Sequence, residues 1–94
     1  MKRLIICLLL LGILGCGATA DKAVTEFNKG VEFADREDWG NAIASYSEAI
    51  RINPDYADAY YNRGCVYDEL GQCKKAISDY CEVMRINLRT GESD

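Results

Sequence analysis

The sequence predicts an all-α fold, in which two stacked antiparallel helix-turn-helix hairpins form a short solenoid after a separate N-terminal segment. Two observations predict it. Between residues 23 and 90 the chain repeats itself with a period of 34 residues, and such periods are typical of stacked supersecondary units. Each repeat also divides into two stretches of helix length that turn residues separate. Pro54 stands at the joint between the repeats, where it prevents the preceding helix from continuing.

The repeat is defined by identities in a single register. A shift of 34 residues places ten residues of the first unit on identical residues of the second. The identities include Gly30 with Gly64, Tyr46 with Tyr80, and residues 51–53 with 85–87. A 34-residue period with glycine in its first half, alanine in its second half and proline at the joint resembles the tetratricopeptide repeat. The resemblance covers residues 23–90, and it implies hairpins whose first helices line a concave, protein-binding groove.

The first residues are typical of an export signal. A basic start at Lys2-Arg3 precedes the apolar run 4–14, which is too short to cross a bilayer because a spanning helix needs about 20 apolar residues. The ending Ile13-Leu14-Gly15-Cys16 resembles the bacterial lipobox. This resemblance implies cleavage after Gly15, lipid attachment to Cys16 and a location in the cell envelope, with the outer membrane favoured. The alternative is an ordinary signal in which Cys16 is incidental.

These features divide the chain into five parts. The parts are a signal peptide (1–15), the lipidated cysteine and a short tether (16–22), the first repeat (23–56), the second repeat (57–90) and a polar tail (91–94). The expected helices cover residues 23–36, 40–52, 57–70 and 73–86. Gly71 suits the C-terminal end of the third helix, and Asp55 suits an N-cap before it.

Small residues at equivalent positions predict how each hairpin packs. Gly30 and Gly64 lack a Cβ, so a neighbouring helix can approach closely there. The small residues expected on the facing helices are Ala42 and Ala76. The aromatic pairs expected beside them are Phe33 with Tyr46 and Tyr67 with Tyr80.

The composition excludes several classes of function. The chain carries 11 basic and 15 acidic residues, and its net charge of −4 argues against binding to the phosphate backbone of nucleic acids. It contains no histidine, which excludes histidine-dependent nucleophilic catalysis and zinc sites that need an imidazole. Carboxylate pairs such as Asp68-Glu69 lie at helix ends, where charges are normally solvated. We therefore expect neither an enzyme nor a cofactor.

The groove implied by the resemblance falls on two sets of residues. The first helix contributes Val24, Phe27, Val31, Ala34 and Asp35, and the third contributes Asp58, Tyr61, Cys65, Asp68 and Glu69. A ligand that suits both sets is a protein or peptide segment with apolar anchors and a basic end. Each set also has a second interpretation. The apolar residues of the first set have the spacing of a buried helix face, and the acidic set suits a solvated face.

The two ends of the predicted stack differ in polarity. The outer side of the first helix is polar, as a solvent-facing cap requires, and carries Thr25, Glu32 and Arg36. The last helix presents an open end face of Cys73, Ile77, Tyr80 and Met84. We expect this face to meet a partner, which includes a second copy in a homodimer. Alternatively, Tyr80 and Met84 fold onto their own hairpin.

Three cysteines follow Cys16, and their spacing matches no common zinc site. Cys73 and Cys81 lie eight residues apart on one expected helix, about 12 Å at 1.5 Å per residue. This separation exceeds the ~7 Å limit between the Cα atoms of a disulfide. Small buried thiols, Cys65 included, and a bridge between two chains through Cys73 both stay open.

The sequence thus predicts a small lipid-anchored interaction module of the bacterial cell envelope. Such a module binds a protein partner through the groove or the open end face, and it reaches the membrane through its lipid. The alternative is a structural unit with no ligand of its own, which self-associates or is a truncated piece of a longer repeat array.

Overall fold

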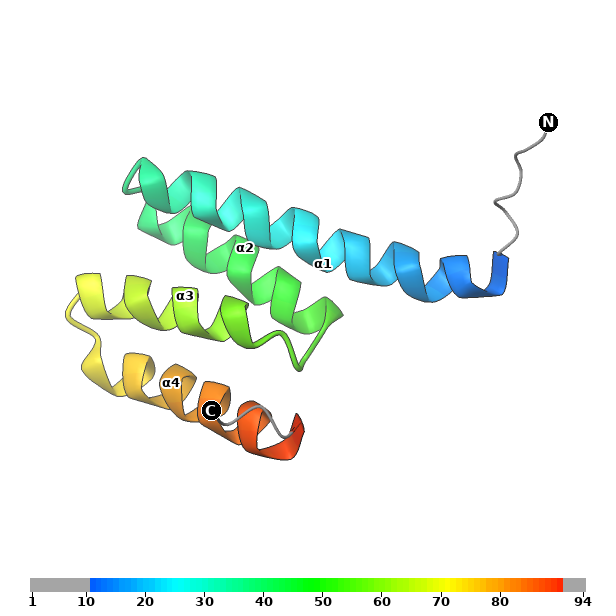
Figure 1. Cartoon of the computed structure of the whole chain (residues 1–94). Helices are drawn as coiled ribbons and strands as arrows, with labels where there is room; N and C mark the ends of the chain where they lie inside the picture. Colours follow the sequence, from blue (N-terminus) through cyan, green and yellow to red (C-terminus); the bar gives the residue numbers. More distant parts are fainter. Residues whose placement is uncertain (1–10, 91–94) are drawn as a thin grey trace.

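The computed structural model of this chain describes residues 11–90, with side chains for residues 21–89. Four helices follow one another in the order α1 (Leu11–Asp35), α2 (Trp39–Ile52), α3 (Ala57–Glu69) and α4 (Cys73–Thr90). The described residues contain no strand, so the predicted all-α fold is confirmed. Figure 1 shows two hairpins, α1–α2 and α3–α4, stacked through the contact of α2 with α3.

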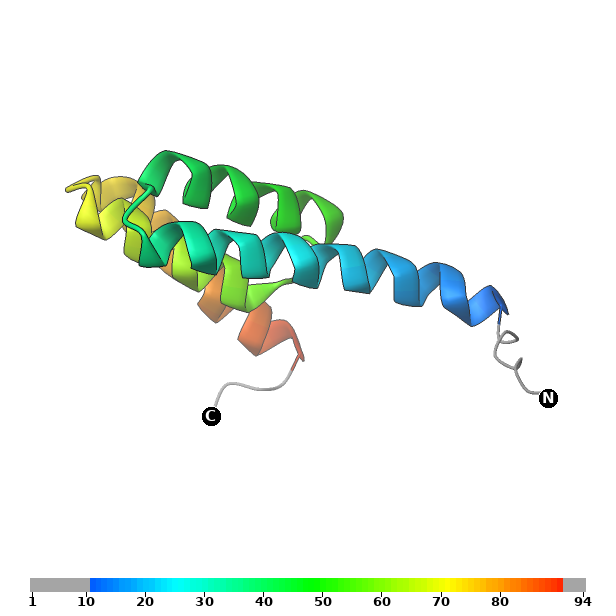
Figure 2. The same cartoon turned by 90° about the horizontal axis from the view of Figure 1, so that it is seen from above.

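The helices extend beyond the ranges that the sequence predicts. α1 begins at Leu11, so residues 17–21 of the expected short tether are helical, and α1 projects past α2 at its N-terminal end (Figures 1 and 2). α4 continues to Thr90 instead of ending at Ile86. Residues 1–10, which hold most of the expected signal, lie outside the described residues. Within residues 11–90, no helix has both the length and the hydropathy that crossing a membrane requires.

The same hydrogen-bonded turn ends α1 and α3. After α1, the Asp38 amide donates to the carbonyl of Phe33 at 2.8 Å, and after α3 the Gln72 amide donates to the carbonyl of Tyr67 at 2.8 Å. This arrangement needs one residue with positive φ. Gly71 supplies it after α3 with φ +76°, as predicted, whereas Glu37 supplies it after α1 with φ +60°. The first turn therefore holds a non-glycine residue in a conformation that costs about 1–2 kcal/mol.

The predicted N-cap role of Asp55 is wrong. Tyr56 occupies the N-cap position of α3, and no side chain caps this helix. The carboxylate of Asp55 instead forms an ion pair with Arg89 near the end of α4. The extra turn of α4 explains the difference, because it carries Arg89 past the predicted end of the helix to the α2–α3 connection.

A tyrosine ring packs on a glycine inside each hairpin. A Cβ added to Gly30 would lie 2.5 Å from Cε1 of Tyr46, and one added to Gly64 would lie 2.7 Å from Cε1 of Tyr80. The close approach is therefore as predicted, but its partner is not. Ala42 and Ala76 are buried in the hairpins, while the tyrosine rings meet the glycines because they reach across to the facing helix.

The aromatic pairs also differ from the prediction. The ring of Phe27, rather than Phe33, pairs with Tyr46 at 5.6 Å between centroids, and Tyr61, rather than Tyr67, pairs with Tyr80 at 5.7 Å. Phe33 packs elsewhere against the core cluster of Ala42, Tyr46 and Val66. The ring of Tyr67 lies beneath the cations of Arg63 and Lys75.

An ion pair within the second hairpin also reaches the first. Arg63 on α3 donates to both carboxylate oxygens of Asp79 on α4, at 2.9 and 2.8 Å, and to Oγ of Ser47 on α2, at 3.0 Å. The Arg63 and Asp79 side chains are only 19% and 5% exposed. The hydrogen bonds to Asp79 raise the pKa of Arg63, although burial acts in the opposite direction. One guanidinium thus holds three helices together.

The glycine–tyrosine contact can be tested by adding a methyl group. Gly30→Ala should lower the free energy of unfolding, because a clash with a buried ring costs about 1–3 kcal/mol and outweighs the propensity gain of about 1 kcal/mol. Gly40→Ala is the matched control: no atom lies within 4 Å of its added Cβ, so stability should rise by about 0.5–1 kcal/mol. Urea unfolding followed by circular dichroism measures both. Equal effects at the two positions would refute the contact.

The ion pair can be tested by removing its acid. Asp79→Ala should destabilise the chain by about 3 kcal/mol, because it leaves the Arg63 cation buried without a carboxylate. Glu82→Ala is the control, since Glu82 pairs with Arg85 on the exposed side of the same helix, where such pairs contribute less than about 1 kcal/mol. The midpoint of urea unfolding reports the difference. A loss at Asp79 no larger than that at Glu82 would contradict this role.

Candidate partner-binding groove

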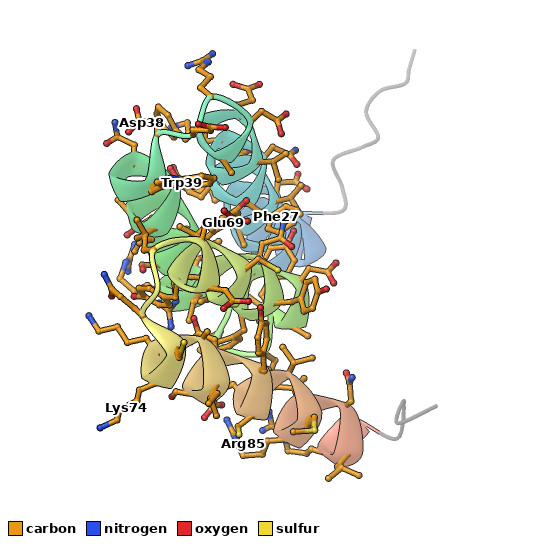
Figure 3. All side chains as sticks on the ribbon, turned by 90° about the vertical axis from the view of Figure 1, so that its left-hand side faces the viewer. Phe27, Asp38, Trp39, Glu69, Lys74 and Arg85 are labelled. Carbon is orange, nitrogen blue, oxygen red and sulfur yellow. The ribbon has the colours of Figure 1, made fainter. Side chains whose placement is uncertain are left out.

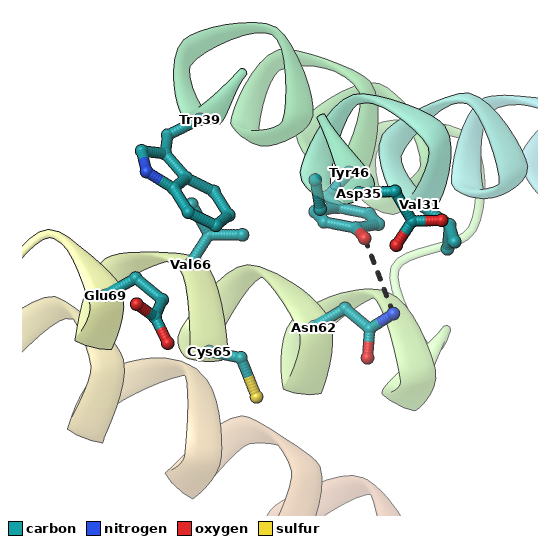
Figure 4. Close-up of a pocket in the computed structure, with 9 residues that line it drawn as sticks. Val31, Asp35, Trp39, Tyr46, Asn62, Cys65, Val66 and Glu69 are labelled. Atoms are coloured by element: carbon teal, nitrogen blue, oxygen red, sulfur yellow. Dashed lines mark hydrogen bonds between the residues drawn. The ribbon is translucent and has the colours of Figure 1, made fainter. Parts of the chain in front are cut away.

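A pocket of about 290 Å³ lies where the two hairpins meet. Three helices line it: Val31, Ala34 and Asp35 from α1, Trp39 and Tyr46 from α2, and Asn62, Cys65, Val66 and Glu69 from α3. Figure 4 shows Trp39 and Val66 together on one side of the pocket, and Val31 and Asp35 on another. The stacking of α2 on α3 creates this pocket, because it places the C-terminal part of α1 beside α3.

The pocket combines apolar walls with negative charge. Asp35 and Glu69 bring two exposed carboxylates, and none of the nine lining residues is a lysine or arginine. Burial raises the pKa of the Tyr46 phenol, while a hydrogen bond from Asn62, whose Nδ2 lies 3.5 Å from the phenol oxygen, lowers it. Tyr46 therefore stays a neutral phenol near neutral pH. Such a pocket suits a cationic group that is attached to an apolar one.

Trp39 is a pocket residue that the sequence analysis does not place in the groove. The half-buried indole packs against the core cluster. It also forms a wall of the pocket, since α2 begins at Trp39, directly after the turn that ends α1. Trp39 is the single tryptophan of the chain. It follows the predicted groove residue Asp35 by only four positions, and this proximity in the sequence is the signal that could have placed it in the groove.

Five of the predicted groove residues come together in this pocket, namely Val31, Ala34, Asp35, Cys65 and Glu69. Phe27 lies deeper, between the rings of Tyr46 and Tyr56, with centroids 5.6 and 5.2 Å away. The other predicted residues do not line the pocket. They are exposed on the same helices: Val24 on α1, and Asp58, Tyr61 and Asp68 on α3.

Cys65 links the pocket to α4. The Tyr80 hydroxyl donates to Sγ of Cys65 at 3.6 Å. This hydrogen bond and the burial of the phenol raise the pKa of Tyr80 to about 12. Tyr80 is half-buried beside Gly64 and Tyr61, so it contributes little to the open end face on which the sequence analysis places it.

The rest of the open end face is exposed. Ile77 and Met84 are each 59% exposed, and Leu88, which continues the same face of α4, is 72% exposed. Cys73 and Cys81 are also exposed, and both are free thiols, as is the half-buried Cys65. The described residues hold no group of three or more potential ligands that could bind a metal ion.

The opposite end of the stack is polar. Thr25, Glu32 and Arg36 on α1 are exposed. Two of their counterparts in the second repeat, Ala59 and Val66, are buried. The third counterpart, Leu70, is 39% exposed. The polar outer side of α1 is thus as predicted, and at two of the three positions the equivalent residue is buried between the hairpins.

Comparison with known proteins agrees with this geometry. Residues 30–71 match a family described as TPR repeat, and residues 57–90 match one described as tetratricopeptide repeat. An uncharacterized protein of Methanocaldococcus jannaschii is 35% identical over 51 residues, which are 54% of this chain and 59% of that protein. The chain thus spans somewhat more than half of this relative.

Tetratricopeptide repeats are generally non-enzymatic scaffolds, and they commonly bind protein partners. The two matches together extend from Gly30 to Thr90, and they include the C-terminal end of α1 and all of α2, α3 and α4. Over these residues the chain is therefore similar to tetratricopeptide repeats.

Proposed function

We propose that this chain is a protein-interaction module whose groove holds a partner segment with an apolar and a basic side chain. The observation that carries this proposal is the pocket between the hairpins, where Trp39 and Val66 lie opposite the carboxylate of Asp35. An aliphatic side chain of the partner would pack on Trp39 and Val66. A lysine or arginine next to it would reach Asp35 and Glu69.

The energetics favour a cation that enters together with an apolar group. A single exposed ion pair contributes less than about 1 kcal/mol, which is too little for specific binding. Hydrogen bonds to charged groups in a desolvated site contribute about 1.5–3 kcal/mol each. When a partner covers the pocket, its apolar group and the apolar walls exclude water from the two carboxylates. The apolar group of the ligand therefore strengthens the hydrogen bonds that its cationic group makes.

We further propose that Cys16 carries lipid and that the chain acts at the bacterial cell envelope, with the outer membrane favoured. This proposal rests on the lipobox-like ending at Cys16. The alternative function is a structural repeat unit that associates through its open end face and has no groove ligand. The exposure of Ile77 and Met84 favours this alternative.

The single tryptophan gives a direct test of the groove. Peptides without tryptophan, in which one arginine stands one to four positions from one leucine, should shift the Trp39 fluorescence on binding. Asp35→Asn combined with Glu69→Gln should weaken the best of these peptides at least tenfold, since two charge-assisted contacts are lost. Fluorescence titration at a fixed low salt concentration measures the dissociation constants.

The matched control for this test is Glu32→Gln combined with Glu37→Gln. It removes the same two charges from exposed positions of α1 and the turn that follows, outside the pocket. The control should bind like the unaltered chain. If both double variants lose affinity equally, the attraction is a general effect of net charge and the groove assignment is wrong.

The lipid anchor has its own test. When the full gene is expressed in a bacterium fed with labelled palmitate, the unaltered chain should take up label and fractionate with membranes. Cys16→Ser should abolish the label and leave the N-terminal segment uncleaved, whereas the control Cys73→Ser should keep both label and cleavage. Label on the Cys16→Ser chain would overturn the anchor but would leave the groove proposal intact.

A further inference from the structure

We propose that the partner in the groove is α4 of a second copy of this chain, so that copies associate head to tail. This inference rests on the proposed function of the groove and names its occupant. It joins two surfaces of opposite character, one on each side of the molecule: the acidic, apolar groove and the basic, apolar outer face of α4.

The outer face of α4 has the apolar half of the required chemistry. Ile77, Cys81, Met84 and Leu88 follow one another at i, i+4, i+7 and i+11, a spacing that places them on one side of a helix. All four are exposed. In the first hairpin the equivalents of Cys73 and Ile77 are Trp39 and Ile43, and both of these pack against the core cluster that includes Val66 of α3. The same positions are thus covered in one repeat and open in the other.

The same helix has the basic half. α4 carries four basic side chains and two carboxylates, a net charge of +2 in a chain whose net charge is −4. Lys74, Arg85 and Arg89 lie at i, i+11 and i+15, along one edge of the apolar stripe. All three are exposed. Arg85 and Arg89 also form surface ion pairs within the chain, with Glu82 and Asp55, and such exposed pairs are weak enough to exchange partners. Figure 3 shows Lys74 and Arg85 on the side of α4 that faces away from the other helices.

The groove has the complementary charge. Asp35, Asp58, Asp68 and Glu69 are exposed along α1 and α3, and the predicted groove positions include no lysine or arginine. Exposed apolar side chains accompany them, with Val24 at 45% and Tyr61 at 54% exposure. Complementary charge steers and orients association, and apolar contact then stabilises it.

Other surfaces of a second copy fit α4 less well. The end of the stack formed by α1 presents Thr25, Glu32 and Arg36, which are polar and exposed, so it offers no apolar cover. In an antiparallel, two-fold pair of α4 helices, each edge of the apolar stripe on one helix lies beside the same edge of the stripe on the other helix. Lys74 and Arg85 would then face like charges.

Head-to-tail contact differs from a two-fold dimer in its growth. A contact between two different patches leaves one free groove and one free α4 face at the ends of every open assembly, so association continues until a ring closes or a filament forms. The mass of the unaltered chain should therefore rise with concentration beyond that of a dimer. Salt at 0.5 M should lower it, because exposed charges are screened.

Two complementary variants test the inference. The groove variant carries Asp35→Arg and Glu69→Arg, and the α4 variant carries Ile77→Asp and Arg85→Glu. We would measure the mass of the full chains by sedimentation equilibrium in a density-matched non-ionic detergent, which keeps the apolar run 4–14 dispersed and is common to all samples. Each variant alone should be a monomer. Their equimolar mixture should form a 1:1 dimer and no larger species, because it contains one intact groove and one intact α4 face.

The alternatives give different results. If the groove variant alone associates like the unaltered chain and the α4 variant does not, α4 pairs with α4 and the inference is overturned. If the unaltered chain stays monomeric at every concentration, the inference also fails, while the Trp39 titration decides separately whether the groove binds other partners. Circular dichroism checks that every chain is helical, and the milder pairs Asp35→Asn with Glu69→Gln and Ile77→Ser with Met84→Ser replace any variant that unfolds.

Discussion

The contact of a tyrosine ring with a glycine sets the spacing of the two helices in each hairpin, and the rest of the structure depends on that spacing. Tyr46 is buried against Gly30, and Tyr80 lies against Gly64. Because a Cβ at either glycine would overlap the ring, the two helices of a hairpin can come this close only if the residue that faces the tyrosine is a glycine. The ring of Phe27 and the amide of Asn62 then meet Tyr46. The core and one wall of the groove are thus built on the same side chain.

The two hairpins use this contact to different ends. Tyr46 is enclosed because α3 covers the first hairpin, and its ring forms part of the core cluster with Val66. Tyr80 has no third hairpin beside it within the described residues, and its hydroxyl turns to Cys65 instead. Of these two equivalent tyrosines, Tyr46 therefore packs in the core, whereas Tyr80 links the groove to α4. The difference arises from position in the stack and not from residue type.

The period of 34 residues was sufficient to predict four helices, their pairing and the polar outer side of α1, since these depend on where apolar residues recur. It could not predict which atoms meet. The partners of Gly30 and Gly64 depend on the rotamer of a long aromatic side chain, which residue type does not determine. The wall formed by Trp39 depends on the turn at Glu37, whose positive φ no sequence pattern indicated.

The sequence does contain a pattern that indicates the ion pair of Arg63 and Asp79. Both residues stand on apolar faces of their helices, where a single charge would be costly, and they have opposite sign. Two such residues on the paired helices of one hairpin are best placed together. The third partner, Ser47, carried no comparable signal, because a serine is compatible with almost any surface position.

The unbroken course of α1 has a consequence for how the groove is presented. α1 is a single helix from Leu11 to Asp35, and Asp35 lines the pocket. A flexible connection would let the groove sample all directions about position 16, whereas a continuous helix transmits rotation as well as distance. Each residue of an α-helix advances by about 1.5 Å and turns by roughly 100°. The number of residues between position 16 and the first hairpin therefore determines the direction in which the groove faces about the axis of α1. One residue more or fewer in this stretch would swing the groove through more than a quarter of a circle about the axis of α1.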